Sequence, residues 1–132
     1  MCDTGLKRTH AKSVIGYRAY ERHEWHGNGE LRSFYAGSEM LPLGVEVTAR
    51  TGRFHAFQSK KAVKLWFDKE RNSLWYPVEV HKVVLSGDLK SGTWENGTSK
   101  TYTGQRARRI QLVAHCNPDI DHSENNKLTW LE

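Results

Sequence analysis

The sequence predicts an α+β fold, in which one main helix at about residues 59–70 packs on a twisted, mainly antiparallel sheet of five to seven strands. Three observations predict this fold. Short segments of alternating apolar and polar residues recur along the chain, one segment has the spacing of an amphipathic helix, and glycine-containing turns separate them. With 132 residues the chain can bury one core, and a second independent core would be hard to fill.

The first part of the chain predicts an arm followed by strands. Residues 1–12 are polar and basic, so we expect a flexible arm ahead of a single globular domain at residues 13–132. The stretch SVIGYRAY, residues 13–20, alternates between two faces and predicts a strand. A Gly-Asn-Gly turn at 27–29 follows, and residues 31–40 are expected to hold a further short strand.

The centre of the chain predicts two strands and then the helix. Residues 45–49 and 53–57 are short strands joined by a turn at Thr51-Gly52. Ser59 is expected to cap the helix, because its hydroxyl can accept hydrogen bonds from the free amides of the first turn. Residues at three- and four-residue spacing then form one apolar helix face: Ala62, Val63, Trp66 and Phe67.

The second half of the chain predicts further strands. The segment 75–85, WYPVEVHKVVL, has the strongest strand pattern, and Pro77 indicates a strand start or a sheet edge because proline lacks an amide donor. The glycine-punctuated stretch from residue 87 to about 97 predicts a β-hairpin. Residues 109–115 predict another strand, and the closing LTWLE predicts a last short piece.

The charge balance favours an anionic partner. Twenty Lys and Arg against fifteen Asp and Glu give a net charge of +5, which favours nucleic acid, a nucleoprotein or an acidic protein face. No apolar run approaches the roughly 20 residues that span a bilayer, and the first residues lack the apolar core of a secretory signal. Two cysteines without a spaced motif fit free thiols, so we expect a cytoplasmic protein with no membrane partner.

Basic residues concentrate in the helix and just before the last long strand. We expect them to form one anion-binding face, with Tyr102 or Trp75 as a stacking platform. The alternative is a solvated helix face, which is normally rich in lysine. The candidate partner-binding residues are Arg50, Arg53, Lys60, Lys61, Lys64, Arg106, Arg108 and Arg109.

His55 stands between aromatic residues and raises the question of catalysis. A histidine there can carry protons or bind a ligand, but no carboxylate or nucleophile is close to it in sequence. We therefore interpret His55 as structural and predict no catalytic residue and no cofactor. If the fold forms a small ligand pocket, its candidate residues are Arg18, Tyr20, His55 and Trp75.

A cluster of potential metal ligands follows the last long strand. Zinc sites usually show two ligand pairs at set spacing, whereas here one adjacent His-Cys pair precedes scattered acidic and histidine residues. We expect a solvated loop and no metal. The residues are His115, Cys116, Asp119, Asp121 and His122.

Several segments, taken in order, resemble a family of small uncharacterised phage and prophage domains. The resemblance covers about 100 residues, which is the length of one typical domain. The family's central motif is Gly-Phe-His-Ala, and this chain departs from it because Arg53 stands between Gly52 and Phe54. The resemblance implies a phage origin, and so a host cytoplasm, rather than a particular chemistry. The matching segments are Tyr17-Arg18-Ala19-Tyr20, Phe54-His55-Ala56-Phe57, the 59–70 helix, residues 77–84 and residues 108–113.

The chain is also similar to ADP-ribosyltransferases, which use a first-strand Arg or His, a strand-then-helix unit beside the nicotinamide pocket, and a catalytic Glu. Arg18, residues 54–59 and Glu79 occupy comparable places. The Gln/Glu-x-Glu motif of that family is missing near the final strand, where Arg109-Ile110-Gln111 stands. The likeness therefore implies nucleotide binding more than transfer.

These observations support three functional hypotheses. The first is a small, non-enzymatic, phage-type accessory protein that binds nucleic acid or a host nucleoprotein, for example as a counter-defence (anti-CRISPR-like) inhibitor. The second is a nucleotide-binding or ADP-ribosyl-transferring enzyme. The third is a structural component of the virion. The sequence leaves the oligomeric state open.

Overall fold

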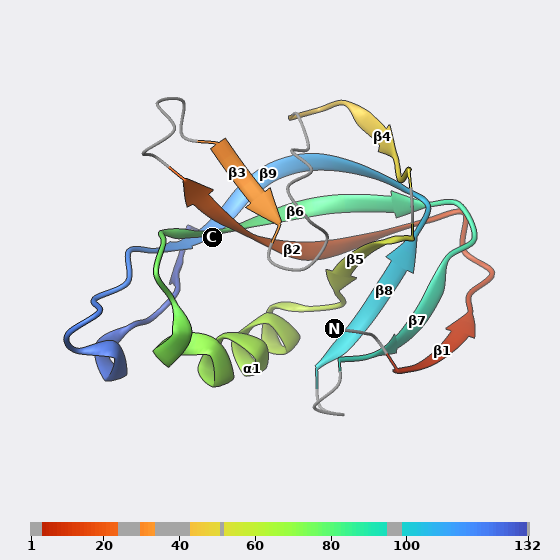
Figure 1. Cartoon of the computed structure of the whole chain (residues 1–132). Helices are drawn as coiled ribbons and strands as arrows, with labels where there is room; N and C mark the ends of the chain where they lie inside the picture. Colours follow the sequence, from red (N-terminus) through yellow and green to blue (C-terminus); the bar gives the residue numbers. More distant parts are fainter. Residues whose placement is uncertain (1–3, 24–29, 34–42, 51, 95–98, 132) are drawn as a thin grey trace.

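The described part of the computed structural model comprises residues 4–23, 30–33, 43–50, 52–94 and 99–131. It contains ten strands, one α-helix and two short 3-10 helices (Figure 1). The elements are β1 (Thr4–Arg8), β2 (Ser13–His23), β3 (Glu30–Ser33), β4 (Glu46–Thr48), β5 (Phe54–Phe57), α1 (Lys60–Glu70), η2 (Arg71–Ser73), β6 (Val78–Ser86), β7 (Lys90–Thr93), β8 (Lys100–Gly104), β9 (Arg106–Cys116), η3 (Ser123–Asn125) and β10 (Thr129–Trp130).

All ten strands belong to one sheet in the order β1-β7-β8-β5-β2-β6-β9-β10, with β3 added to β2 and β4 added to β9. The strand pairs are antiparallel, as predicted, and the expected hairpin is β7–β8. The prediction of five to seven strands was too low. The excess comes from short edge strands: β1 lies within the segment expected to be a flexible arm, and its polar sequence has no alternation to reveal it.

The sheet carries a hydrophobic cluster on each face, because β2, β6 and β9 alternate apolar residues between the two sides. On one face α1 packs its apolar side over Ala19, Val78 and Val80, and we call this the helix-side cluster (Figure 1). The second cluster lies on the opposite face of the sheet. Its buried members are Tyr20, Phe54, Ala56, Val83, Leu85, Leu89 and Ala107.

The helix forms where its spacing predicted it. Ser59 has an extended backbone and its side-chain oxygen accepts a hydrogen bond from the Ala62 amide at 3.1 Å, so it is the N-cap. The four predicted apolar residues are buried, and Lys61 and Lys64 are exposed on the other side.

Strands β2 and β5 approach each other closely at Gly16. A Cβ atom at that position would lie 2.8 Å from the Ala56 Cβ and 2.9 Å from the Phe57 carbonyl oxygen. Only glycine fits without a shift of the neighbouring strand. This contact brings the strand that precedes α1 against the centre of the sheet, where Tyr17 pairs with Phe57.

Candidate anion-binding site

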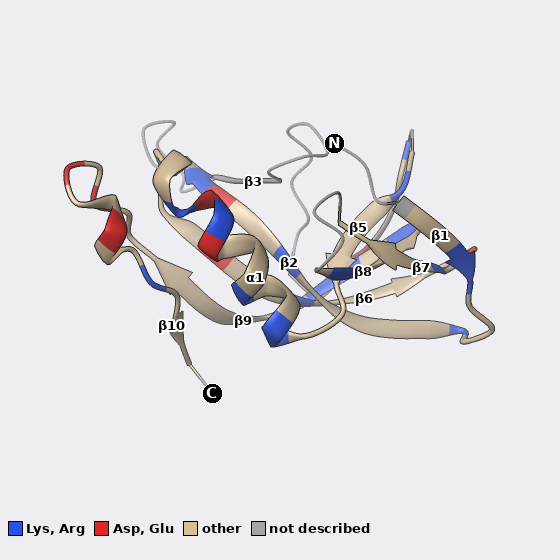
Figure 2. Cartoon of the chain, turned by 90° about the horizontal axis from the view of Figure 1, so that it is seen from below, with Lys and Arg blue, Asp and Glu red and all other residues tan. Residues whose placement is uncertain are grey.

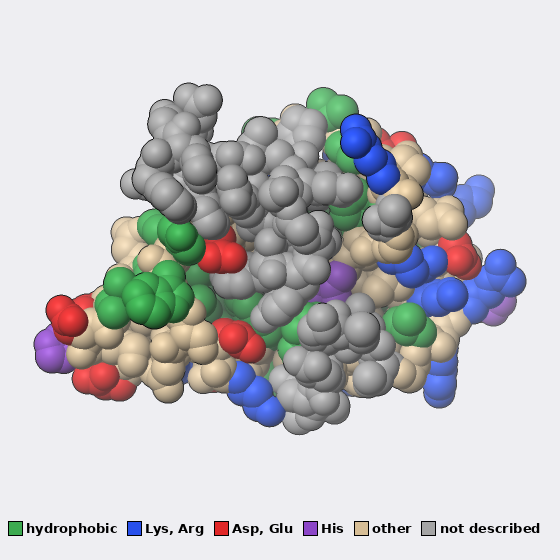
Figure 3. All heavy atoms as spheres, viewed as in Figure 1, with side chains coloured by type: hydrophobic (Ala, Val, Ile, Leu, Met, Phe, Trp, Pro, Cys, Tyr) green, Lys and Arg blue, Asp and Glu red, His purple; other side chains and the backbone are tan. Residues whose placement is uncertain are grey.

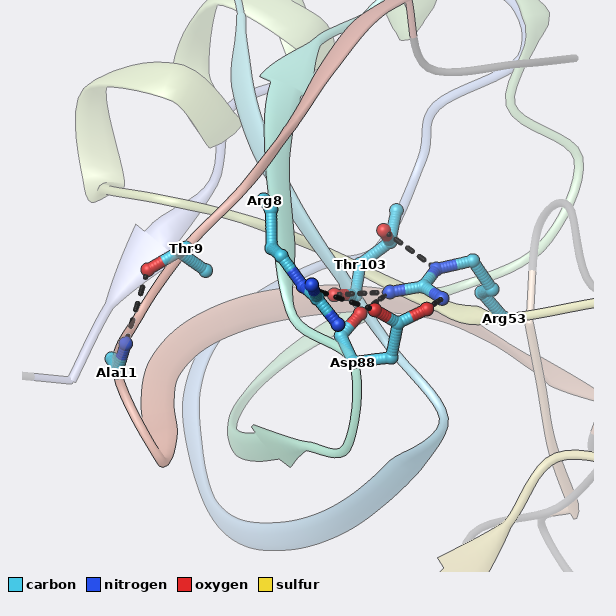
Figure 4. Close-up of polar contacts among 6 residues, drawn as sticks. All are labelled: Arg8, Thr9, Ala11, Arg53, Asp88 and Thr103. Carbon is cyan, nitrogen blue, oxygen red and sulfur yellow. Dashed lines mark hydrogen bonds and ion pairs between the residues drawn. The ribbon is translucent and has the colours of Figure 1, made fainter.

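The structure gives Arg53 a set of internal partners. Its Nε donates to the Thr103 hydroxyl at 2.9 Å, its Nη1 donates to the Asp88 carboxylate at 2.8 Å, and its Nη2 donates to the Asp88 carbonyl (Figure 4). Arg8 approaches the same carboxylate at 4.0 Å. The hydrogen bond from Arg53, more than the nearby charges, holds the pKa of Asp88 below its ordinary value. Arg53 therefore fixes the β6–β7 turn.

The arginines of β9 divide between the two faces of the sheet. Residues opposite each other in antiparallel pairs share a face, so Arg108, opposite Val84, lies on the α1 side. Arg109 lies opposite Val83 of the second cluster, with Nη1 3.5 Å from the His81 Nδ1. The eight predicted cations thus do not make one face.

The lysines of α1 also separate. Lys60 places its Nζ 5.3 Å from the Trp130 ring centroid, an arrangement that allows a cation–π interaction. Lys64 lines a groove between α1 and the C-terminal segment. Lys61 lines a different hollow of about 300 Å³ at the start of α1, together with Lys100.

The groove that includes Lys64 combines positive charge with apolar walls. Its volume is about 500 Å³. Arg71 is paired with Asp68 across one helical turn, so Lys64 and Lys127 give the groove its net positive charge. We call it the α1 groove, and it is lined by Lys64, Phe67, Asp68, Arg71, Lys127, Leu128 and Trp130.

Of the residues that line the α1 groove, only Lys64 was among the predicted site residues. The missed residues include Lys127 and Trp130. They lie in the closing segment, whose sequence shows no motif. Strand β10 pairs with β9, with Trp130 opposite Ala114, and this long-range pairing brings them to α1. Tyr102 and Trp75, the predicted stacking platforms, are not groove residues. Trp75 is 71% exposed, ahead of β6.

Among the residues that the structure describes, no helix covers the part of the sheet beside the groove. Tyr17 contacts Trp130 edge to face, with ring centroids 6.4 Å apart, and continues the surface onto β2. Beyond Tyr17 the same face presents Ile15 and Val84, and Figure 2 shows that α1 crosses only one part of the sheet. We call this surface the open strip. Its members are Ile15, Tyr17, Lys82, Val84, Arg108 and Gln111.

The residues predicted for a small-ligand pocket fall in different places. Arg18 and Tyr20 lie on the face of the second cluster, opposite His81 and Glu79 of β6. His55 belongs to the other face of β5, although its carbonyl accepts a 2.6 Å hydrogen bond from the Arg18 Nη1. Burial raises the pKa of Tyr20, while Arg18 and Arg109 oppose the shift. Trp75 joins neither group.

Glu79 is held inside a polar cluster on the same face of the sheet as the second cluster. One carboxylate oxygen lies 2.9 Å from the His81 Nε2, and the other accepts a hydrogen bond from Arg22. Burial alone would raise the pKa of Glu79, but these hydrogen bonds outweigh it and hold the pKa below its ordinary value. Both oxygens therefore have internal partners, and the arrangement supports the fold.

His55 packs among aromatic side chains on the helix side. Its ring centroid is 4.9 Å from those of both Phe57 and Trp94. Burial, assisted by the positive charge of Arg18, lowers the pKa of His55 to about 3, so the ring is neutral near pH 7.

The candidate metal ligands after β9 are dispersed. Cys116 is buried in the helix-side cluster, whereas the Asp119 carboxylate accepts hydrogen bonds from the Asp121 and His122 amides and closes a turn. Within the described residues, no three His, Cys, Asp or Glu side chains come together as a metal site.

The fold and the groove define a small α+β protein with a basic, partly aromatic surface beside its helix. Comparison with models of known families, with curated proteins and with solved structures finds no match. None of the helices in the described part of the chain is both long enough and apolar enough to cross a membrane.

Proposed function

We propose that this protein binds nucleic acid through the α1 groove. The observation that carries the proposal is a groove of about 500 Å³ that Lys64 and Lys127 line together with one half-buried tryptophan, Trp130. The Lys60 Nζ stands over the same ring, 5.3 Å from its centroid. Lysines attract phosphates, and an aromatic ring at the same place offers a surface on which a base can stack. An acidic protein face would use the lysines and leave the ring without a function.

The setting we propose is that of a phage-type accessory protein. The net charge of +5 favours encounter with nucleic acid through long-range attraction. A counter-defence role is one form of this proposal, in which the bound nucleic acid is part of a host nucleoprotein. Binding of this kind needs no catalytic group, and Glu79 and Arg18 have structural contacts in the fold.

The test compares two charge reversals of equal size at different ends of the molecule. Lys60→Glu with Lys64→Glu alters one groove residue and the lysine over Trp130, and we call these two residues the groove pair. Lys7→Glu with Arg8→Glu alters exposed residues of β1. Each pair lowers the net charge by four, so a general effect of charge is the same in both. On the face shown in Figure 3, Lys and Arg gather towards the β1–β7 end, which makes this the competing basic surface.

Affinity for a labelled oligonucleotide is measured at several salt concentrations. We expect the groove pair to reduce affinity at least tenfold and to lessen the salt dependence, by about 0.7 in the log–log slope for each lost contact with a single strand. The β1 pair should reduce affinity much less. Equal losses, or a larger loss for the β1 pair, would place the interface elsewhere. No salt-sensitive binding, or capture of a host partner that survives nuclease digestion, would remove nucleic acid as the ligand.

A further inference from the structure

We infer that the ligand is single-stranded, with a base stacked at Trp130 and the strand continuing across the open strip. The inference rests on the proposed function and adds the class of nucleic acid and its path. It follows from two features beside the groove: a half-buried aromatic pair, and a sheet surface on which apolar and basic residues mix.

The aromatic pair lies at the mouth of the groove. Trp130 lines the groove and touches Tyr17 at an interplanar angle of 84°, and both rings are half-buried. Each ring packs one side on the helix-side cluster and keeps another part accessible. Lys60 stands over Trp130, where a phosphate next to a stacked base would lie within its reach.

The open strip extends this site along the sheet. Ile15 is 56% exposed and lies opposite Val84, and Arg108 follows on β9, so the three form a row across three strands. Lys82 lies opposite Tyr17. From Ala114, the partner of Trp130, to Arg108 is six residues of β9, or roughly 20 Å. A path of this length suits a short single strand of nucleic acid, at the lower end of the range of about 4–16 nucleotides that one OB-fold domain binds.

The mixture of residues favours a single strand over a duplex. A duplex presents its phosphates outward and keeps its bases paired, so half-buried rings and exposed Ile15 would gain little from it. Unpaired bases can leave the stack and lie on aromatic and apolar side chains, while the backbone meets Lys82 and Arg108. Two described acidic residues lie along this path, and each is close to an arginine. Asp68 in the groove is paired with Arg71, and the Glu46 Oε1 is 4.0 Å from the Arg106 Nε.

The experiment measures fluorescence anisotropy of a labelled 12-mer, alone and annealed to its complement, with the full chain. We expect the single strand to bind at least tenfold more tightly than the duplex. Trp130→Leu should weaken single-strand binding about tenfold and leave duplex binding nearly unchanged, and Trp130→Phe should keep most of the affinity. The matched control is Trp75→Leu, since Trp75 is exposed and lies outside the groove.

Each outcome separates the two proposals. One outcome is that single strand and duplex bind equally, that Trp130→Leu does not change the affinity, and that Lys60→Glu with Lys64→Glu still lowers it. The ligand would then be held by its phosphates alone, so this inference would fail while the proposed function would stand. If Trp75→Leu weakens binding as much as Trp130→Leu does, the strand does not follow the proposed path from Trp130 across the open strip. If neither oligonucleotide binds, both proposals fail. Thermal unfolding of every variant excludes loss of fold as the cause.

Discussion

Two side chains, His55 and Arg53, show that a basic or titratable residue can have a structural role. His55 has no carboxylate near it in sequence, and the structure surrounds it with Phe57 and Trp94. Arg53 is different, because nothing in its neighbours indicates that Asp88 and Thr103 become its partners through the fold. Sequence reasoning identifies the residue types that carry charge, but tertiary contacts decide which charges face solvent.

The lowered pKa of His55 predicts a pH-dependent stability. In the unfolded chain His55 takes up a proton near pH 6.5, while in the folded protein it does so only near pH 3. Lowering the pH between these values therefore favours the unfolded chain. We expect the free energy of unfolding to fall by about 1.4 kcal/mol between pH 7.5 and 5.5, measured by urea denaturation.

His55→Phe should remove most of this slope, because the replacement packs among aromatics and does not titrate. His122→Gln is the control, since His122 is exposed and should leave the slope intact. The lowered pKa values of Glu79 and Asp88 contribute stability that is lost only at more acidic pH, below this window. A free energy of unfolding that stays constant from pH 7.5 to 5.5 would contradict the lowered pKa of His55.

His55→Ala also separates fold from binding. The substitution leaves a gap beside Phe57 and Trp94, so we expect a lower melting temperature. It removes no groove contact, so the affinity of the folded protein for an oligonucleotide should change less than twofold. Lys60→Glu with Lys64→Glu should show the reverse pattern. Binding lost by His55→Ala in a fully stable protein would make His55 a functional residue.

Among the elements, α1 is the one whose sequence describes it most completely. Its cap, its apolar face and its lysine face all lie within residues 59–70, so local spacing is enough to predict it. Strands β1 and β10 depend on partners far along the chain, β7 and β9. Because β10 supplies Trp130 to the groove, the site was less predictable than the helix that forms its other wall.

The cap of α1 predicts a defined loss of stability. Ser59→Ala removes the oxygen that accepts from the Ala62 amide, and an N-cap of this kind contributes about 1 kcal/mol. Urea denaturation should show this decrease, and Ser59→Asp should restore the stability because aspartate also caps. Equal stabilities for Ser59→Ala and the unmodified protein would mean that the start of α1 is held by packing alone.

The close contact between β2 and β5 predicts a stronger effect. Gly16→Ala would force Ala56 and the Phe57 carbonyl away from β2, and we expect a loss of about 1–3 kcal/mol in the free energy of unfolding. Ser13→Ala is the matched control, an exposed position three residues earlier in the same strand. A loss no larger than that of the control would mean that the two strands separate easily.

The molecule as a whole is organised by four strands that serve both faces. Strands β2, β5, β6 and β9 contribute residues to the helix-side cluster and to the second cluster, so neither cluster can lose its packing without disturbing a shared strand. The α+β class was predictable from local patterns, whereas the order of the strands depends on pairings that no local pattern encodes. The shared strands lead us to expect that the described clusters unfold together.

Labelling of Cys116 tests this cooperativity. Cys116 is buried in the helix-side cluster, and burial raises the pKa of its thiol, partly opposed by a backbone hydrogen bond from Lys127, so a thiol reagent should react only after opening. In a Cys2→Ser background, Phe54→Leu changes the second cluster, on the other face of the sheet. If both clusters open together, a destabilisation of about 1.4 kcal/mol should speed labelling about tenfold, matching the loss measured by urea denaturation. If Phe54→Leu leaves the labelling rate of Cys116 unchanged, then the segment around Cys116 opens on its own and the two faces of the sheet unfold independently.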